Sequence, residues 1–300
     1  MQRYDLCFAW NWEYDAEFSH LLEASCQHYG ISFYSVKPEN LGQVFTCLER
    51  EELSFAAFFD RASESDASFQ PLVDWARRHR LFRINPQSQT IWAVDKATMH
   101  MEFISHGLDT PHTILLPPYA ERPGIHLQDL SPLGGPFAIK PACMGGGEGV
   151  VLAATSWDQV LAVRQQHPDE KYLLQAQVTP QILDGRPAWF RVLFCDGAVY
   201  PCWWNQSTHI YSTVTAEERF RFGLRNLRDV ASRIAQICHL HLFSTEIALA
   251  ESGRFMVVDY VNDPVDLRFQ SKAIDGVPDV YVESIAARLV RLVGRNILLK

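Results

Sequence analysis

The sequence predicts an α/β domain built on a parallel sheet, followed by a longer region of mixed strands and helices. Over residues 1–84, four apolar runs alternate with segments that carry apolar residues at helical spacing. Such alternation is typical of a parallel sheet with right-handed crossovers. Beyond residue 185, apolar runs are joined by short turns instead, which indicates antiparallel hairpins. With 300 residues, 47% of them hydrophobic, the chain can form two or three globular domains.

The first domain is expected to hold strands and helices in strict alternation. The strands are expected at Tyr4–Trp10, Ile31–Val36, Ser54–Asp60 and Leu81–Ile84, and the helices at Glu13–Tyr29, Leu41–Arg50 and Phe69–His79. The turn after the first strand, Trp10-Asn11-Trp12, lacks the glycines of a dinucleotide-binding motif. Arg61 follows the third strand, where α/β sheets place their ligands. It could hold an anionic substrate group, or only cap the strand in solvent.

Composition excludes several classes of function. The formal net charge is −8 and no block of like charges occurs, which argues against a general nucleic-acid binder. No apolar run is long enough to span a membrane. The seven cysteines form no C-x-x-C motif, and no secretory signal begins the chain. We therefore expect reduced thiols and a cytoplasmic protein.

A glycine-rich loop follows a strand that contains a lysine. Strands are expected at Ala138–Pro141 and Val150–Ala154, with the loop Cys143–Gly149 between them. The glycines of the loop are Gly145, Gly146, Gly147 and Gly149. They allow backbone N–H groups to approach an anion closely. The loop leads into a strand and so is not a P-loop. Lys140 precedes it in an apolar strand, where phosphate would be a suitable partner.

The other elements outside the last hairpin follow the same kind of pattern. Helices are expected at Asp95–His106, Ser156–Gln166, Leu224–Cys238 and Pro278–Gly294, and strands at Tyr172–Val178, Trp189–Cys195 and Ala198–Asn205. Asp196-Gly197 between the last two strands predicts a type I′ turn, which sets Arg191 opposite Cys202. Tryptophans surround Arg191, so it could stack on an aromatic ring or reach an anion.

Two apolar runs, Thr245–Ala250 and Phe255–Val261, predict a hairpin that carries two carboxylates. A two-residue loop at Ser252-Gly253 would place Glu246 directly opposite Asp259. Paired carboxylates in an apolar hairpin need a compensating charge, and Mg²⁺ favours oxygen ligands of this kind. Asn262, after the strand, would add a third oxygen. The alternatives are a protonated carboxyl group or an ion pair with an arginine from elsewhere in the chain.

Taken in order, these features resemble the ATP-grasp superfamily, notably its members related to glutathione synthetase and D-alanine–D-alanine ligase. The resemblance covers most of the chain: residues 1–84 resemble the α/β domain that precedes the ATP-binding lobes, and residues 90–300 resemble the lobes themselves, beginning with the Asp95-Lys96 helix start. It implies an N-terminal Rossmann-like α/β domain at residues 1–90. It further implies two α+β lobes that clasp ATP: a central lobe at residues 91–178 and a C-terminal lobe at residues 179–300.

The resemblance also implies roles for individual residues. Lys96 and Lys140 would contact ATP phosphates, and the loop with Gly145, Gly146, Gly147 and Gly149 would cover them. Gln175, Gln177 and Val178 would lie in the segment that meets the adenine edge. Glu246, Asp259 and Asn262 would hold Mg²⁺. Arg191 would reach the transferred phosphoryl group or a substrate carboxylate, and Arg268 would lie where relatives bind the acceptor.

Two positions depart from the family pattern. The last strand reads Asp259-Tyr-Val-Asn262, one residue longer than the usual Glu-x-Asn, so a bulge or strand end must bring Asn262 to the metal. Gln175 stands where relatives carry Glu.

The resemblance implies an ADP-forming ligase that joins a small carboxylate to an amine or related nucleophile through an acylphosphate. The alternatives are a kinase of a small hydroxyl substrate and a nucleotide-binding protein without catalysis. The acceptor is expected between Arg61, the Trp10–Trp12 turn, Arg191 and Arg268. A homodimer is expected because dimers are the commonest oligomers.

Overall fold

The structure is a computed structural model that describes residues 1–125 and 129–298, and its first domain is a parallel sheet. The strands are β1 (Gln2–Trp10), β2 (Phe33–Val36), β3 (Leu53–Arg61) and β4 (Phe82–Ile84). They pair in the order β2-β1-β3-β4, and every pair is parallel. The predicted α/β domain is confirmed.

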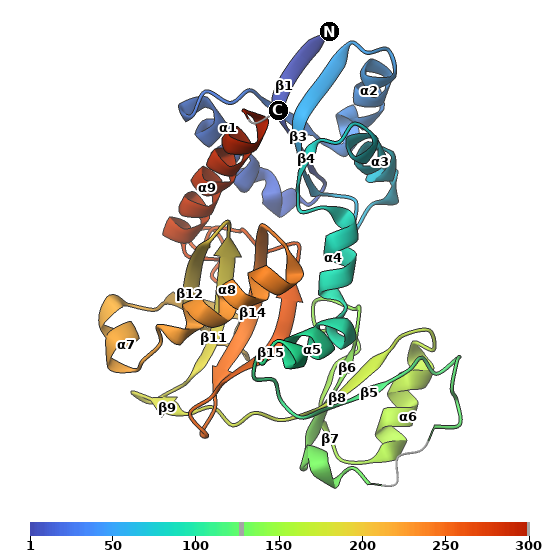
Figure 1. Ribbon diagram of the computed structural model, residues 1–300, viewed down its shortest axis with the longest axis vertical. Coiled ribbons are helices and arrows are strands. Elements are labelled where there is room, and N and C mark those ends of the chain that lie inside the picture. The colour runs from blue at the N-terminus through green and yellow to red at the C-terminus, as the bar shows by residue number, and fades with distance from the viewer. Residues whose placement is uncertain (126–128, 299–300) are drawn as a thin grey trace.

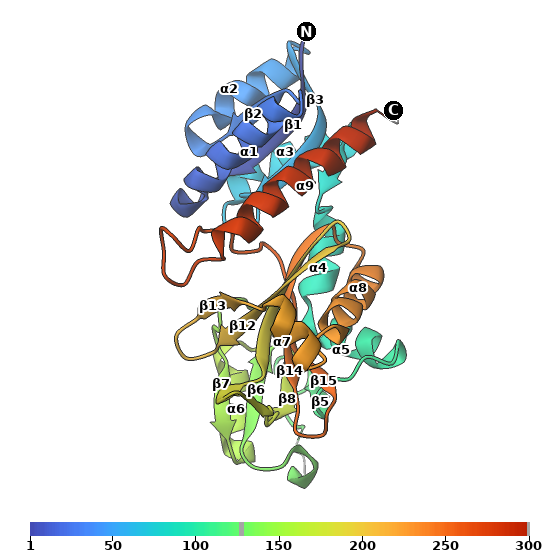
Figure 2. The same ribbon diagram turned by 90° about the vertical axis from the view of Figure 1, so that its left-hand side faces the viewer.

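Helices cover both faces of this sheet. Its own helices are α1 (Ala16–His28, after a 3₁₀ turn at Glu13–Asp15), α2 (Pro38–Glu49) and α3 (Gln70–Arg78, after a 3₁₀ turn at Ala67–Phe69). α2 and α3 bury one face, around Cys7 and Phe58. The other face, around Phe8, is covered by α1 and by the C-terminal helix α9 (Asp279–Ile297). Figures 1 and 2 show α9 lying against α1. The last helix of the chain thus packs on its first domain.

The lobe expected at residues 91–178 follows, and we call it the first lobe from here on. Its antiparallel sheet has the order β5-β8-β6-β7, from β5 (Thr113–Leu116), β6 (Phe137–Pro141), β7 (Val151–Ala154) and β8 (Tyr172–Ala176). The predicted helix α6 (Trp157–Gln166) covers one face, and Ser156 caps it by accepting from the N–H of Gln159. Helix α5 (Lys96–Ser105) lies on the other face and also contacts the next lobe. The cap of α5 is Asp95.

The second lobe carries a five-stranded antiparallel sheet in the order β13-β12-β11-β14-β15. Its strands are β11 (Trp189–Cys195), β12 (Ala198–Asn205), β13 (Ile210–Thr213), β14 (Leu242–Leu249) and β15 (Phe255–Asn262). Helix α8 (Asn226–Cys238) packs on one face with its apolar stripe. The Asp196-Gly197 turn has both φ angles positive, at 45° and 83°, as a type I′ turn requires. Arg191 pairs with Cys202 as predicted.

Several short elements differ from the sequence prediction. Those not predicted are α4 (Gln87–Val94), β5, β9 (Ile182–Leu183), β10 (Arg186–Pro187), β13, α7 (Ala216–Arg221) and the 3₁₀ turn Ser131–Leu133. Two had readable signals. Asp184-Gly185 joins β9 to β10 with positive φ at both residues, and Thr215 forms a capping box with Glu218 at the start of α7. The predicted strand to Val178 is too long, because β8 ends at Ala176.

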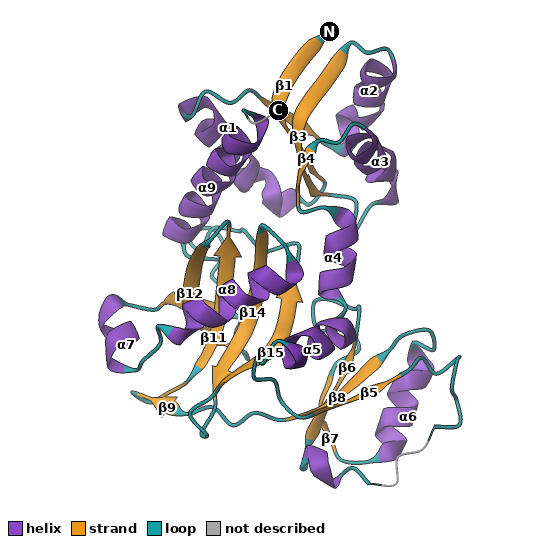
Figure 3. Cartoon of the chain, viewed as in Figure 1, coloured by secondary structure: helices purple, strands orange, loops and turns teal. Residues whose placement is uncertain are grey.

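Helix α4 connects the first domain to the two lobes, as Figure 3 shows. It contacts α5, α8 and β15. Within the described residues, no helix is long and apolar enough to cross a membrane.

Candidate active site

The β14–β15 hairpin sets Glu246 directly opposite Asp259, as predicted. The predicted turn, however, is wrong. Ala250 donates its N–H to the carbonyl of Arg254 (2.9 Å) around three residues, 251–253. Gly253 takes a φ of 79°, which matches the left-handed last residue of such a loop. The register near the turn is therefore one residue away from the predicted one.

β15 contains two bulges, and the first of them restores the predicted register. Ile247 pairs with Val257, but the next pair down the hairpin is Glu246 with Asp259, so Val258 is an extra residue. A second shift lies between Glu246 and Ser244, which pairs with Asn262. The amide Nδ2 of Asn262 donates to the Ser244 carbonyl (3.3 Å). Because a bulge inserts one residue and bends the strand, it accounts for the long spacing from Asp259 to Asn262 and confirms the expected bulge.

Arg191 on β11 faces both carboxylates. Its Nη1 lies 2.6 Å from Glu246 Oε1 and 3.9 Å from Asp259 Oδ2. Its guanidinium also lies 5.6 Å from the centre of the Trp204 ring. The stacking alternative for Arg191 thus occurs, and so does the ion pair with an arginine that was the alternative to Mg²⁺ for the two carboxylates. Contact of Arg191 with a ligand anion stays a prediction. Trp189 Nε1 donates to Glu246 Oε2 (3.0 Å), a contact that sequence reasoning missed.

Two lysines of the first lobe add positive charge to the same place. Burial would raise the pKa of Asp259, but Lys96, Arg191 and Lys140 outweigh burial and hold that pKa below its usual value. Burial conversely lowers the pKa of the Lys140 ammonium, opposed by Asp259 and Glu246. Residues from α5, β6, β11 and the hairpin therefore share one electrostatic field, which is typical of a functional site.

A buried hydrogen-bonded relay holds Lys140. Its Nζ donates to Gln175 Oε1 (2.8 Å) and to the Val258 carbonyl (3.1 Å). Gln175 Nε2 donates to the Tyr260 hydroxyl (2.9 Å), and that hydroxyl lies 2.6 Å from His100 Nδ1. Since Tyr260 accepts from the amide, its own proton is available to His100. The relay assigns the amide orientation of Gln175, and no signal along the sequence joined these distant residues.

The glycine-rich loop adjoins this cluster. Gly146, Gly147 and Gly149 have φ between 61° and 79°, in the left-handed region that favours glycine, whereas Gly145 does not. Lys96 Nζ donates to the Met144 carbonyl (2.8 Å), so the predicted phosphate ligand holds the start of the loop.

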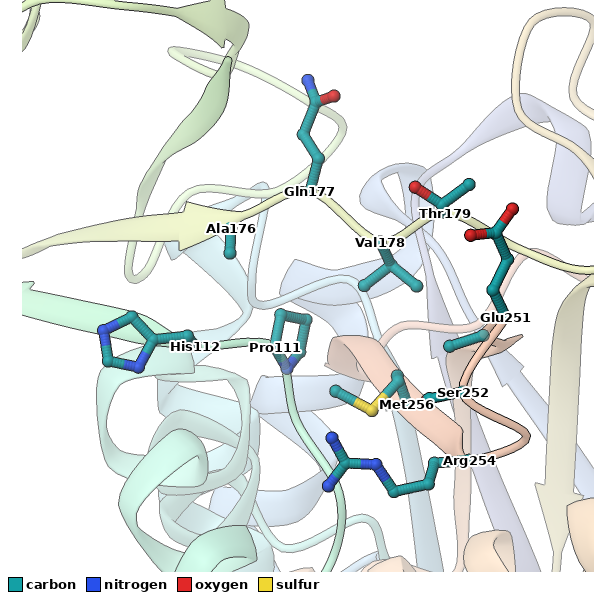
Figure 4. Close-up of a pocket in the computed structure, with 11 residues that line it drawn as sticks. Pro111, His112, Ala176, Gln177, Val178, Thr179, Glu251, Ser252, Arg254 and Met256 are labelled. Atoms are coloured by element: carbon teal, nitrogen blue, oxygen red, sulfur yellow. The ribbon is translucent and has the colours of Figure 1, made fainter. Parts of the chain in front are cut away.

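The segment after β8 connects the two lobes beside a hollow of about 260 Å³. Figure 4 shows Val178 pointing toward Met256 and Pro111, and Gln177 pointing to the other side. There Gln177 Nε2 donates to the Leu152 carbonyl of β7 (2.5 Å). Side chains on both sides thus hold this predicted adenine-edge segment at the junction of the lobes.

Arg61 does not face the cluster, so the expectation that it holds a substrate anion is wrong. Its Nε and Nη2 donate to the two carboxylate oxygens of Asp15 (2.9 and 2.8 Å), and its Nη1 donates to the Val265 carbonyl (2.8 Å). The ion pair is almost fully buried. Arg61 instead joins the first domain to the segment after β15.

Arg268 lies at the expected junction but already has acidic partners. Its guanidinium pairs with Asp266 (2.7 Å) and Asp275 (3.0 Å). It also lies within 6 Å of the ring centres of Trp12 and Tyr14 from the first domain. The expected meeting of Arg268 with the Trp10–Trp12 turn is confirmed, although Arg268 is not a free cation there.

The donor set fits Mg²⁺ when phosphate oxygens complete it. Glu246, Asp259 and Asn262 offer hard oxygens from adjacent strands, which suit Mg²⁺. Across residues 1–125 and 129–298, no group of three or more His, Cys, Asp or Glu side chains could hold a metal ion alone. Two carboxylates and an amide leave positions for ligands from a bound nucleotide.

Comparisons with known proteins agree with this architecture. No family model matches the sequence, and a search of curated proteins finds no match. Among solved structures, D-alanine–D-alanine ligase from Bacillus anthracis with ATP aligns over 99% of this chain and 97% of its own, with a TM-score of 0.67 at 10% identity.

Two further structures align over nearly the whole length. D-cycloserine synthetase DcsG covers 96% of this chain and 99% of its own, with a TM-score of 0.60 at 15% identity. The ATP-grasp ligase PsnB, in complex with a precursor peptide and AMPPNP, covers 98% of both chains, with a TM-score of 0.60 at 13% identity. The α/β domain and both lobes thus have counterparts in these proteins, and the chain has the ATP-grasp fold.

Proposed function

We propose that this protein is an ATP- and Mg²⁺-dependent ligase that joins a carboxylate to an amine or related nucleophile and releases ADP and phosphate. The observation that carries the proposal is the opposed pair Glu246–Asp259 beside Arg191. In this chain the pair lies within a fold that is shared with structures described as D-alanine–D-alanine ligase and ATP-grasp ligase. Two acids and several cations gathered where the two lobes meet suit the transfer of a phosphoryl group, which depends on positioning and electrostatic stabilisation.

The cations would bind and orient the nucleotide. Lys140, held by Gln175 and the Val258 carbonyl, would present its ammonium to an ATP phosphate. Lys96 would do so from the start of α5, next to the loop that holds Gly145, Gly146, Gly147 and Gly149. That loop would cover the phosphates and exclude water, which would otherwise hydrolyse an acylphosphate.

The connecting segment with Gln175, Gln177 and Val178 would meet the adenine edge. Gln177 already ties this segment to β7, so adenine recognition would be linked to the position of the glycine-rich hairpin.

The hairpin would hold the metal through Glu246, Asp259 and Asn262. Mg²⁺ bound there would neutralise charge on the phosphate oxygens. Arg191 balances the charge of the two carboxylates in this structure, but its contact with Asp259 is long, at 3.9 Å. Because Glu246 and Asp259 would be the metal ligands, Arg191 would be the residue left to bind the transferred phosphoryl group or the substrate carboxylate.

The acceptor would bind between the first domain and the second lobe. Among Arg61, Arg191 and Arg268, Arg191 is the one whose acidic partners, Glu246 and Asp259, would serve as metal ligands. Arg268 would act there together with Asp266 and Asp275, as part of a triad rather than as a lone cation.

The test is product analysis with trapping. Purified protein is incubated with Mg²⁺, ATP and a pool of carboxylates, with and without amines, and ADP, AMP and phosphate are measured. Hydroxylamine is added as a nucleophile, because it converts an acylphosphate into a stable hydroxamate. The proposal requires carboxylate-dependent ADP and a hydroxamate. AMP with pyrophosphate, or a phosphorylated hydroxyl compound without hydroxamate, would contradict it.

A further inference from the structure

A second hollow, of about 740 Å³, lies at the end of the five-stranded sheet of the second lobe, near the β11–β12 turn. It opens on the side of helix α8 and around the edge of β12. Phe190 and Val192 face α8, so Arg191 between them points to the opposite face of the sheet. The hollow is therefore separate from the candidate active site.

Four arginines from different elements line this hollow. They are Arg219 of α7, Arg225 before α8, Arg228 of α8 and Arg288 of α9. Asp229 is the carboxylate among the lining residues. The chain as a whole carries a net charge of −8, so this hollow has the opposite sign from the molecule.

The positive charge of the hollow is poorly balanced. Within the part of the chain that the structure describes, no carboxylate lies within ion-pair distance of Arg219, Arg225 or Arg228. Arg288 donates Nη1 to the Asp196 carbonyl (2.9 Å), and its buried Nε has no hydrogen-bond partner among the described residues. The Asp196 carboxylate is 3.8 Å from Arg288 but contacts Arg295 more closely. Like charges that line one hollow repel, so an anion bound there would stabilise this arrangement.

The walls of the hollow are formed by regular structure. The type I′ turn at Asp196-Gly197 fixes one side. β13 pairs with β12 only from Cys202 onward, so the β12 edge before it has no strand partner among the described residues. Val199, Pro201 and the buried Leu224 add apolar surface. The arginines therefore surround a preformed space with an apolar floor.

We propose that this hollow binds a small molecule that carries two or more phosphate charges. Its volume is in the range of small-molecule sites. Guanidinium groups bind phosphate and carboxylate in bidentate geometry. Here they come from several sides, and a tetrahedral phosphate accepts hydrogen bonds from several directions, whereas a planar carboxylate accepts mainly in its own plane. The apolar floor would contact the carbon part of the ligand.

The test is a calorimetric titration of the Mg²⁺-free protein with pyrophosphate at low salt. The variant Arg225→Ala/Arg228→Ala removes two exposed side chains, and the loss of each charge-assisted hydrogen bond is expected to weaken binding about tenfold. Arg225→Lys/Arg228→Lys keeps the charge but loses the bidentate geometry, so its affinity should be intermediate. The control is Arg78→Ala, which removes one positive charge from an exposed position of α3, the same change in charge as each of the two substitutions makes at the hollow. Lys140→Ala removes pyrophosphate binding at the candidate nucleotide site.

The proposal requires binding that survives Lys140→Ala and Arg78→Ala and is weakened about 100-fold in the Arg225/Arg228 double alanine variant. Binding abolished only in Lys140→Ala would assign pyrophosphate to the nucleotide site and overturn the proposal. No binding at all would also overturn it. Direct binding of an acidic peptide such as oligoglutamate, without binding of pyrophosphate or tripolyphosphate, would overturn the proposal in favour of a protein partner.

Discussion

Arg61 and Arg191 both bind carboxylates, but they lie in regions of opposite character. At the domain interface, Arg61 makes a two-point contact with Asp15, and both side chains are at most 3% exposed. In the cleft, Arg191 contacts Glu246 through one nitrogen and leaves Asp259 at 3.9 Å. Both arginines lie at the end or in the middle of an apolar strand, and the sequence contains no direct indication of this difference.

The comparison indicates how to separate a structural arginine from a functional one. The Arg61–Asp15 pair is buried and completed by the Val265 carbonyl, so removal of either partner leaves an uncompensated charge. In the cleft, Asp259 is stabilised by Lys96, Arg191 and Lys140 together. Partners that are shared can be exchanged when a ligand arrives, whereas dedicated partners cannot.

The largest expected effect is on stability, at the interface. Arg61→Ala should lower the free energy of unfolding by about 3–5 kcal/mol, because it leaves Asp15 buried without its partner. Chemical denaturation with urea measures the decrease. Replacing both residues with apolar side chains, as in Arg61→Met/Asp15→Leu, should recover most of it. If Arg61→Ala is as stable as the wild type, the pair is not a structural lock.

The next effect is on activity, in the cleft. Asp259→Asn keeps the shape of the side chain but removes a charge that the proposed metal needs, so ATP turnover should fall by about 100- to 1000-fold. The rate of ADP release at saturating ATP and Mg²⁺ measures it. Thermal unfolding is the control, and the variant should unfold within a few degrees of the wild type. Near-normal turnover would show that Asp259 does not bind a catalytic metal.

The sequence predicted the parallel sheet, both major hairpins and the Glu246–Asp259 pair. That pair was predicted for an incorrect reason, because the assumed two-residue turn is one residue short and the bulge at Val258 compensates. Local turn signals determine whether a hairpin forms, whereas bulges depend on packing that one strand does not reveal. The residue spacing of the last strand nevertheless predicted a bulge or a strand end at Asn262, and the structure has both there.

Contacts between distant segments could not be predicted in the same way. Asp15 meets Arg61, and Tyr260 joins His100 to Gln175, across intervals that no periodic pattern spans. A buried polar group needs a partner, but the sequence does not state which one. For this reason the sequence pattern placed Arg61 at the acceptor and did not predict the relay behind Lys140.

The relay leads to a pH dependence of stability on the cleft side. Burial, and then His112, lower the pKa of His100 from its usual 6.5 to about 4. Between those values the unfolded chain binds a proton that the folded protein does not. Stability therefore rises with pH from about 4 to 6.5 and is lost on acidification through that window, by about 3 kcal/mol at most. Urea denaturation at a series of pH values measures this.

The variant His100→Gln separates the contribution of His100 to the pH dependence of stability from that of acidic groups that titrate in a similar pH range. Its amide can still accept from the Tyr260 hydroxyl, but it does not titrate. The stability of the variant should depend less steeply on pH than that of the wild type between pH 4 and 6.5. Parallel curves would mean that His100 does not titrate in this window.

The smallest effect is expected at Cys143, which lies at the start of the glycine-rich loop and is exposed. Although the residue is exposed, the chain around it shields the sulfur in part, and this desolvation, with Glu170 and Asp95 nearby, raises the pKa of the thiol to about 11. The thiolate is the reactive form of cysteine, so little nucleophile is present near neutral pH. Cys143→Ser should therefore retain ATP turnover within about twofold, since an unperturbed surface change alters energies by only about 0.5 kcal/mol. Alkylation by iodoacetamide should be slower than for a free cysteine at pH 8. A fall in turnover of more than tenfold in the serine variant, together with rapid alkylation, would show that the loop contains a reactive thiol. That result would contradict the raised pKa of Cys143.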